Sequence, residues 1–213
     1  MEMDLITQAC FIISTIILFL YMQKIPQTFL TKLRRRNHHR STAKHHFIIG
    51  AQLLNKSRAT KDRTASIKLA KQAATEAAKS ISLDPTDAAS YILKALALDQ
   101  QGLVTSAIEA LDEGLAPGTV NSLSYGERSD ALLKRAEMKV KLSKRGVVDS
   151  AVEDLVECCK LKGDNANAYR LLGECYEKKE MLEDAVVAYE RAVRIDPGCG
   201  VARDALNRLN KPE

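Results

Sequence analysis

Apolar side chains in the last third of the chain recur every three or four positions, the spacing of an amphipathic helix. Tyr169, Leu172 and Tyr176 form one such stripe, and a second stripe follows from Ala185 until Pro197 interrupts it. Because proline cannot continue a helix, this pattern predicts two consecutive helices, the second of which ends before Pro197.

Small residues mark the places where these two helices must approach closely. Gly173 lies in the first predicted helix and Ala185 in the second, and a larger side chain at either place would hold the backbones apart. The complete set of positions is Tyr169, Leu172, Gly173, Tyr176, Ala185, Tyr189, Ala192 and Pro197. With this set, residues 166–199 resemble a tetratricopeptide repeat, a helix–turn–helix unit of about 34 residues.

The resemblance implies an all-α solenoid in which helix pairs stack into a right-handed superhelix with a concave binding groove. Residues 88–121 and 125–163 fit the same pattern, and residues 43–87 fit it as a degenerate first repeat. A short helix over residues 201–210, apolar on one face, is expected to cap the array. The predicted tetratricopeptide domain therefore spans residues 43–213 and holds about four repeats.

Two details of the repeats are specific expectations. Ser124 and Glu127 have the spacing of a capping box, which predicts the start of a helix. In the first repeat we expect a helix over residues 43–55 and a second helix over residues 65–83. The polar basic connection between them is then about ten residues longer than such repeats usually have.

Residues 5–22 form an apolar run of eighteen residues without a charge. As a helix it is about 27 Å long, close to the hydrocarbon thickness of a bilayer. A cleaved signal peptide needs a basic start and a cleavage site, and a core helix needs a polar face; this run has none of these. It predicts a single transmembrane helix that acts as a signal-anchor, preceded by a short non-cytosolic N-terminus at residues 1–4.

The net charge of +5 arises from the segment that follows this run. Seven Lys or Arg and no acid lie between Gln23 and His46, whereas the remainder of the chain after His46 is neutral as a whole. Residues 23–42 are therefore predicted to be a basic juxtamembrane tether, and the positive-inside rule places the repeat domain in the cytosol. Such an anchor is similar to those of the endoplasmic reticulum and of the mitochondrial or plastid outer membrane.

The arginines of the tether allow two interpretations, both of which stay open. Arg34, Arg35, Arg36 and Arg40 form a basic cluster that either lies against anionic lipid headgroups or serves only as a solvated topology signal.

The chain lacks the residue patterns of an enzyme or a metal protein. Its four histidines, His38, His39, His45 and His46, have several cations as neighbours and no carboxylate or thiol partner, so we expect no metal site. The five cysteines are an odd set without recurrent spacing, which indicates reduced thiols. No nucleophile and base are paired within the repeats, and no aromatic platform accompanies the arginines. We therefore expect neither enzymatic activity, nor a cofactor, nor nucleic-acid binding.

The resemblance also implies where a partner would bind, because tetratricopeptide proteins hold ligands with the first helix of each repeat. The corresponding side chains here are Ile48, Ile49, Gln52, Ile92, Leu93, Leu96, Leu133, Lys134, Glu137, Arg170, Leu171 and Glu174. The middle of this set is apolar and suits an amphipathic helix or an apolar peptide. The alternative is that some of these side chains are buried between layers or covered by the insert after the second repeat.

One known ligand of the family, the acidic tail of cytosolic chaperones, is disfavoured. Proteins that clamp this tail carry Lys, Asn and Arg at places that correspond here to Ile48, Gln52, Leu93, Asp130 and Lys134. Only Lys134 is cationic, and a carboxylate needs paired donors.

These inferences predict a non-enzymatic, membrane-anchored docking adaptor or receptor-like scaffold with a protein or peptide partner. The alternative is a structural subunit of a larger membrane complex, in which the repeats form a permanent interface.

Overall fold

The computed structural model describes residues 2–142 and 147–209, without the side chains of residues 2–6, 20 and 22–38. Within these ranges the fold is all-α. The helices are α1 (Glu2–Ala59), α2 (Arg63–Leu83), α3 (Ala88–Gln100), α4 (Val104–Gly114), the short 3-10 helix η1 (Val120–Ser122), α5 (Tyr125–Leu142), α6 (Val147–Leu161), α7 (Ala166–Lys178), α8 (Leu182–Ile195) and α9 (Gly200–Leu209).

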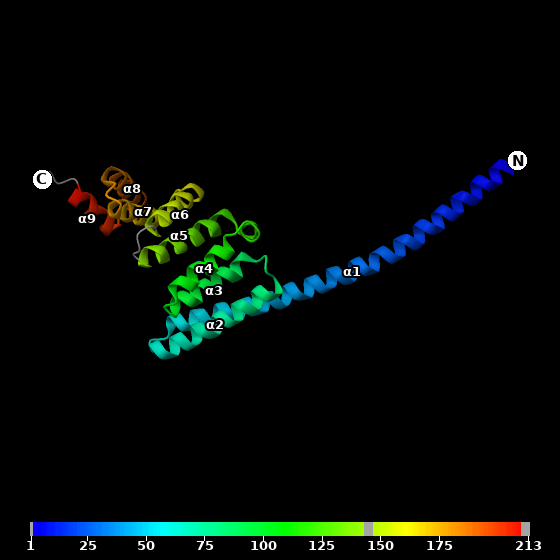
Figure 1. Cartoon of the computed structure of the whole chain (residues 1–213), viewed down its shortest axis with the longest axis horizontal. Helices are drawn as coiled ribbons and strands as arrows, with labels where there is room; N and C mark the ends of the chain where they lie inside the picture. The colour runs from blue at the N-terminus through cyan, green and yellow to red at the C-terminus, as the bar shows by residue number, and fades with distance from the viewer. Residues whose placement is uncertain (1, 143–146, 210–213) are drawn as a thin grey trace.

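The helices pack in consecutive pairs, and the pairs stack in chain order. The last part of α1 packs against α2, and α3 with α4, α5 with α6 and α7 with α8 form the other pairs. Each second helix also touches the first helix of the next pair, and α9 lies against α8 where the capping helix is predicted. Figure 1 shows the first part of α1 extending away from this stack, with the two chain ends at opposite extremes.

Close approach between helices depends on glycines at two equivalent places. A Cβ atom added to Gly173 of α7 would lie 2.6 Å from Cε1 of Tyr189 in α8. In the first repeat, a Cβ atom at Gly50 would lie 3.0 Å from Cδ2 of Leu93 and 3.3 Å from the carbonyl oxygen of Ala73. Helices therefore pack tightly at both ends of the array, including the repeat whose sequence pattern is degenerate.

The connection in the first repeat is shorter than the sequence predicts. Residues 56–59 continue α1, and only residues 60–62 separate it from α2. Asp62 caps α2 by accepting hydrogen bonds from the backbone N–H groups of Thr64 and Ala65. The prediction of a long polar loop is wrong, because two serines of this segment are buried and bind each other's backbone across α1 and α2. The Ser57 hydroxyl donates to the Ser66 carbonyl at 2.8 Å, and the Ser66 hydroxyl donates to the Ser57 carbonyl at 2.9 Å.

The predicted capping box at the start of α5 is present. The Ser124 backbone N–H donates to Glu127 Oε2 at 2.8 Å, and the Glu127 N–H donates to Ser124 Oγ at 3.3 Å. The Ser124 hydroxyl also donates to this carboxylate, and these bonds lower the pKa of Glu127 because they favour its charged form.

The insert before α5 is a compact turn that folds back onto the second repeat. The buried Thr119 hydroxyl donates to the carbonyl oxygens of Glu113 and Gly114, which lie at the end of α4. Ser122 accepts a hydrogen bond from the Ala88 N–H at the start of α3. These bonds satisfy the buried polar groups of a segment that has little regular structure of its own.

The N-terminal segment is helical along its whole described backbone. The predicted transmembrane run and the basic tether both form part of α1, so the first helix of the repeats continues from them without a loop. Within the part of the chain that the structure describes, no helix holds a stretch that is both long and apolar enough to cross a bilayer. In the predicted run Leu5, Ile6, Leu20 and Met22 lie outside the described side chains, as do Arg34, Arg35 and Arg36 of the basic cluster.

Candidate functional site

The first helices of the repeats carry the twelve side chains predicted to line a groove, and three of these are buried. Leu93 is 5% exposed and packs with Leu54 and its neighbours between the first two repeats. Leu133 and Leu171 are 9% and 4% exposed and belong to the core shared by α5 to α8. These three leucines hold layers together and are not available to a partner.

The remaining apolar members of the set lie on α1 and α3. Ile48 is 53% exposed, whereas Ile49, Ile92 and Leu96 are half-buried. Gln52 is exposed on the same stretch of α1. The accessible apolar surface is therefore concentrated in the first two repeats, at the N-terminal end of the array.

The remaining polar members, on α5 and α7, form a chain of contacts with one another. Lys134 pairs with Glu137 at 2.7 Å, and the other oxygen of Glu137 accepts a hydrogen bond from the Asn167 amide at 3.1 Å. Arg170 donates to the Asn167 oxygen and pairs with Glu174. The donors at this end already have acceptors within the protein, so a bound anion would have to compete with them.

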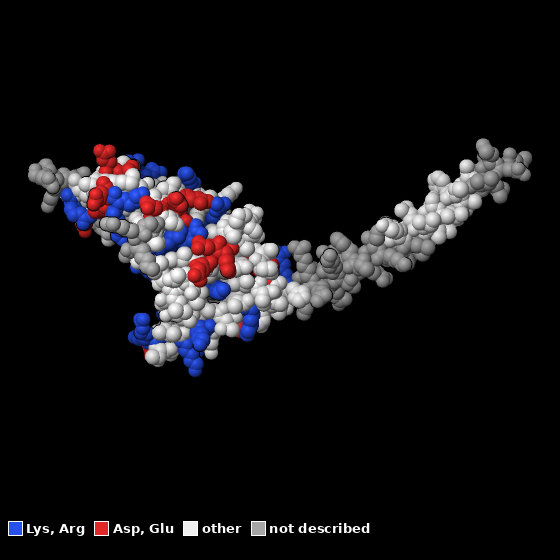
Figure 2. Space-filling view, in the orientation of Figure 1, with Lys and Arg blue, Asp and Glu red and all other residues white. Residues whose placement is uncertain are grey.

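Charges of both signs mix over the C-terminal repeats. In the face shown in Figure 2, Lys, Arg, Asp and Glu alternate around α5 to α9, whereas the described part of the α1 extension carries no charge on that face. Over α5 to α9, the described charges in this view therefore form no extended field of one sign that would steer a polyanion.

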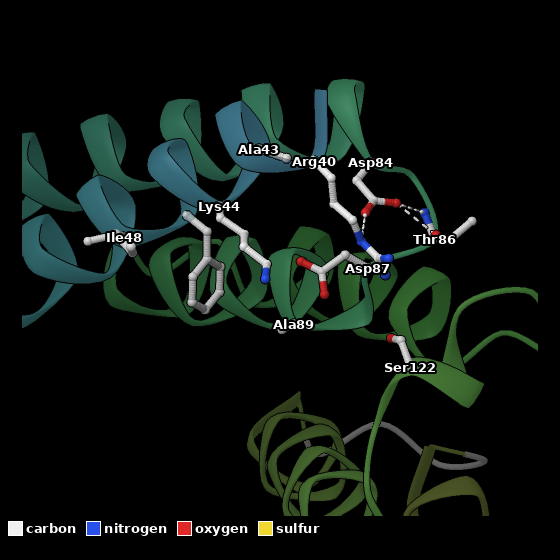
Figure 3. Close-up of a pocket in the computed structure, with 10 residues that line it drawn as sticks. Arg40, Ala43, Lys44, Ile48, Asp84, Thr86, Asp87, Ala89 and Ser122 are labelled. Carbon is white, nitrogen blue, oxygen red and sulfur yellow. Dashed lines mark hydrogen bonds and ion pairs between the residues drawn. The ribbon is translucent and has the colours of Figure 1, made fainter. Parts of the chain in front are cut away.

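One cavity lies where α1 enters the repeats. It has a volume of about 350 Å³ and is lined by α1, the α2–α3 turn, the start of α3 and η1. Figure 3 shows Arg40 and Lys44 extending from α1, with Arg40 meeting Asp84 and Lys44 pointing toward Asp87. We call this cavity the α1–α3 pocket. The sequence prediction missed most of it, because only Ile48 among its lining residues belongs to the predicted groove.

A buried ionic cluster joins α5 to α6 and was not evident from the sequence. Asp154 is 5% exposed and accepts hydrogen bonds from Arg135 Nε at 2.9 Å and Lys139 Nζ at 2.7 Å. Lys139 also donates to the Ser150 hydroxyl. The available signal in the sequence is that two cations, Arg135 and Lys139, lie four residues apart on an otherwise apolar helix face. Because its charges are paired with one another, the cluster offers no free group for chemistry.

The cysteines do not form a reactive centre. All five are free, and Cys158 and Cys175 are buried. Burial raises the pKa of Cys159 to about 12 and that of Cys175 to about 11, so both thiols are protonated at neutral pH.

The histidines differ from the sequence prediction at one place. His46 Nδ1 lies 2.6 Å from Glu76 Oε2, so the expectation that the histidines have no carboxylate partner is wrong for His46. The Glu76 carboxylate also pairs with Lys79, and the hydrogen bonds from Lys79 and then His46 lower the pKa of Glu76. His38 lies outside the described side chains. Among the described residues, no group of three or more His, Cys, Asp or Glu side chains could hold a metal ion.

Two family profiles described as tetratricopeptide repeat match the chain, one over residues 166–199 and the other over residues 59–120. The first match coincides with the repeat identified from the sequence, and the second covers α2 to α4. The chain therefore contains tetratricopeptide repeats, and this part of the prediction is confirmed. No curated protein matches the chain significantly.

Solved structures show the same fold at low sequence identity. MamA from Desulfovibrio magneticus RS-1, from residue 41 to its end, is 20% identical with a TM-score of 0.64, and the match covers 79% of this chain and 84% of that one. The pilF protein of Pseudomonas aeruginosa is 15% identical with a TM-score of 0.60, over 82% of this chain and 68% of that one. The first repeat domain of Spaghetti (RPAP3), solved with the HSP90 peptide SRMEEVD, is 24% identical with a TM-score of 0.50, over 59% and 92%.

Proposed function

We propose that this tetratricopeptide repeat protein is a membrane-anchored scaffold whose repeats face the cytosol and hold a protein or peptide partner. The repeat fold supports the binding of proteins, since stacked helix pairs present an extended surface without supplying reactive groups. Neither the cysteines nor the paired charges described above provide a nucleophile with its base, so the proposed role is non-enzymatic.

The observation that carries the membrane part of this proposal is the apolar surface of α1. Within its first part Phe11, Ile12, Ile13 and Ile17 are 76%, 59%, 56% and 60% exposed. Because these residues point in different directions around the helix, no single neighbouring helix covers them all. A helix that is apolar all round is stable only when it is enclosed, and a lipid bilayer encloses it on every side.

The polar side chains within this surface are satisfied in the way that hydrocarbon requires. The Ser14 hydroxyl donates to the Phe11 carbonyl at 2.9 Å, and the Thr15 hydroxyl donates to the carbonyls of Phe11 and Ile12 at 3.0 Å and 2.8 Å. Each hydroxyl thus has an acceptor within its own helix and needs no water.

The positive charge that follows the apolar run supports the cytosolic orientation of the repeats. The candidate membranes are the endoplasmic reticulum and the outer membranes of mitochondria or plastids. Of the predicted basic cluster, Arg34, Arg35 and Arg36 would then lie nearest the anionic headgroups, whereas Arg40 lies beside Asp84 at the repeats.

The repeats themselves favour reversible docking over a permanent interface. The buried leucines of the predicted groove already have cover, and the polar side chains on α5 and α7 are paired with one another. A subunit that is permanently embedded in a complex would leave a broad apolar surface bare when isolated. On the repeats, the accessible apolar side chains of the predicted groove are confined to α1 and α3.

The test is the fractionation of cells that express the full chain with a C-terminal epitope. We expect the epitope to remain in the membrane pellet through alkaline washing and to be cleaved by external protease without detergent. A chain that is released by the wash would disprove the anchor, and an epitope that is protected until detergent is added would disprove the cytosolic orientation.

A charged double variant, Ile13→Asp with Ile17→Asp, makes the test specific. Each acid at the centre of a membrane helix costs about 2.5–3.5 kcal/mol, so this variant should be lost from the washed pellet. The control is Val187→Asp, which adds a charge at an exposed apolar residue of α8 and should leave membrane retention unchanged.

A further inference from the structure

The α1–α3 pocket has the size and surface of a site for one or two side chains. Its volume is about 350 Å³, at the lower end of the range of small ligand sites. Ala43, Phe47 and Ile48 of α1 and Ala89 of α3 supply its apolar lining. A whole helix would not enter such a space, whereas a bulky aliphatic or aromatic side chain would.

Two features that lie outside the repeat unit build this pocket. Arg40 lines it only because α1 continues for at least one turn before residue 43, where the first repeat begins. Ser122 lines it because the insert is fixed by the hydrogen bond from the Ala88 N–H, at 3.0 Å. The pocket therefore depends on the continuation of α1 and on the insert, and not on the helix pairs alone.

The acids of the pocket already have partners in the protein. Asp84 accepts a hydrogen bond from the Thr86 hydroxyl at 2.7 Å, and Arg40 Nε lies 3.4 Å from its second oxygen. Asp87 accepts a hydrogen bond from the Ser90 hydroxyl at 2.6 Å and is the N-cap residue of α3. A carboxylate at a helix N-terminus is stabilised further by the helix dipole.

Lys44 differs from these residues because its ammonium group has no such partner. It is exposed, and among the described contacts it has no hydrogen bond or ion pair. Figure 3 shows its side chain reaching from α1 toward Asp87, although no ion pair joins the two. A cation next to an apolar cavity is complementary to a ligand that carries an apolar group and a carboxylate close together.

We propose that the α1–α3 pocket binds a partner peptide in which a bulky apolar side chain is adjacent to an acidic one. The apolar side chain enters the cavity over Phe47 and Ile48, and the carboxylate pairs with Lys44. This inference rests on the proposed function as a scaffold for protein partners and adds the chemistry that such a partner must show.

The probe is a printed array of six-residue peptides, Gly-Ser-X-Z-Ser-Gly. X is Leu, Ile, Phe or Ala, and Z is Asp, Glu, Asn, Gln or Lys. The full chain is reconstituted in lipid nanodiscs and detected through a C-terminal tag. We expect peptides with a bulky X and an acidic Z to retain at least threefold more protein than their Asn or Gln counterparts, and peptides with Ala at X to retain little.

Three variants assign any preference to the pocket. Lys44→Gln removes the charge and keeps a shorter polar side chain, so the acidic preference should disappear while the preference for a bulky X remains. Ile48→Ser alters a side chain that is already 53% exposed and should weaken the preference for a bulky X without unfolding the domain. The control Lys68→Gln removes an exposed cation from α2 and should change neither preference.

The proposal is overturned if acidic and amide peptides bind equally, or if Lys44→Gln behaves like Lys68→Gln. A preference for Lys at Z would also overturn it, since Asp87 would then govern the site. These outcomes leave the membrane tests untouched, so a failure of the peptide proposal and a failure of the anchor are separate results.

Discussion

The contact between Gly173 and Tyr189 allows a quantitative test of the repeat packing. A Cβ atom at Gly173 would lie 2.6 Å, 2.8 Å and 2.8 Å from the ring atoms Cε1, Cδ1 and Cζ of Tyr189. Carbon atoms in normal contact are about 3.5–4.0 Å apart, so the substitution Gly173→Ala forces a shift of about 1 Å. The ring has little freedom to move, because Tyr189 is 1% exposed and its hydroxyl donates to Glu177 Oε1 at 2.6 Å.

Two opposing contributions set the expected change in stability. Overpacking of this kind costs about 1–3 kcal/mol, whereas alanine is about 0.8–1.0 kcal/mol better than glycine within a helix. The control Gly126→Ala carries the same exchange in the first turn of α5, where an added Cβ atom meets no other atom within 4 Å. Comparison of the two variants removes most of the helix-propensity term, so Gly173→Ala should be less stable than Gly126→Ala by about 1–3 kcal/mol.

The measurement is thermal unfolding of the full chain in nanodiscs, followed by circular dichroism at the helix band. In a domain of this size each kcal/mol shifts the midpoint by about 2–4 °C. A Tyr189→Leu change makes room for the new methyl group, so the double variant with Gly173→Ala should lose less stability than the two single changes added together. If Gly173→Ala is as stable as Gly126→Ala, the reasoning about close approach is refuted.

Three further predictions concern other parts of the repeats. Ser57→Ala should lower the free energy of unfolding by about 1–3 kcal/mol, because it leaves the buried Ser66 carbonyl without its donor. The double variant Ser57→Ala with Ser66→Ala should lose less stability than the two single variants added together. Strict additivity of these losses in urea unfolding would contradict the paired arrangement. The pKa of Glu76 lies below its ordinary value near 4.5 because of hydrogen bonds from Lys79 and then a histidine. The charged carboxylate of Glu76 therefore stabilises the folded state at pH values above the pKa that it has in the unfolded chain. This stabilisation is lost as the pH falls through the lower pKa that Glu76 has in the folded chain. In a plot of the free energy of unfolding against pH, Glu76→Gln should therefore reduce the slope below about pH 5. Because burial raises the pKa of Cys159 to about 12, iodoacetamide at pH 7.5 should modify this thiol only after unfolding. Rapid modification of Cys159 itself in the folded chain, located by peptide mapping apart from the exposed Cys10, would disprove its enclosure.

The sequence alone determined those features that depend on local spacing. The repeat over residues 166–199 could be predicted because three of its residues have a local geometric role. Gly173 and Ala185 allow two helices to approach closely, and Pro197 ends the second helix. The start of α5 was readable for the same reason, since a capping box satisfies backbone groups within one helical turn.

Only the tertiary structure decided which polar residues are enclosed and which apolar residues are free. Ser57 and Ser66 look like loop residues in the sequence, but each hydroxyl finds its acceptor on the neighbouring helix and both are buried. Leu93 has the spacing of a groove residue, yet it lies between two repeats, because the absence of a side chain at Gly50 lets α1 pack closely against it.

The α1–α3 pocket likewise required the structure. Arg40, Asp84 and Ser122 come from three segments far apart in the chain, and no periodic pattern relates them. Their proximity follows from the continuation of α1 beyond the repeats and from the way the insert is fixed at the start of α3. The spacing of residues in the sequence predicts contacts within one helix or one repeat. A pocket between distant segments depends on how the helices stack, and the spacing does not predict this stacking.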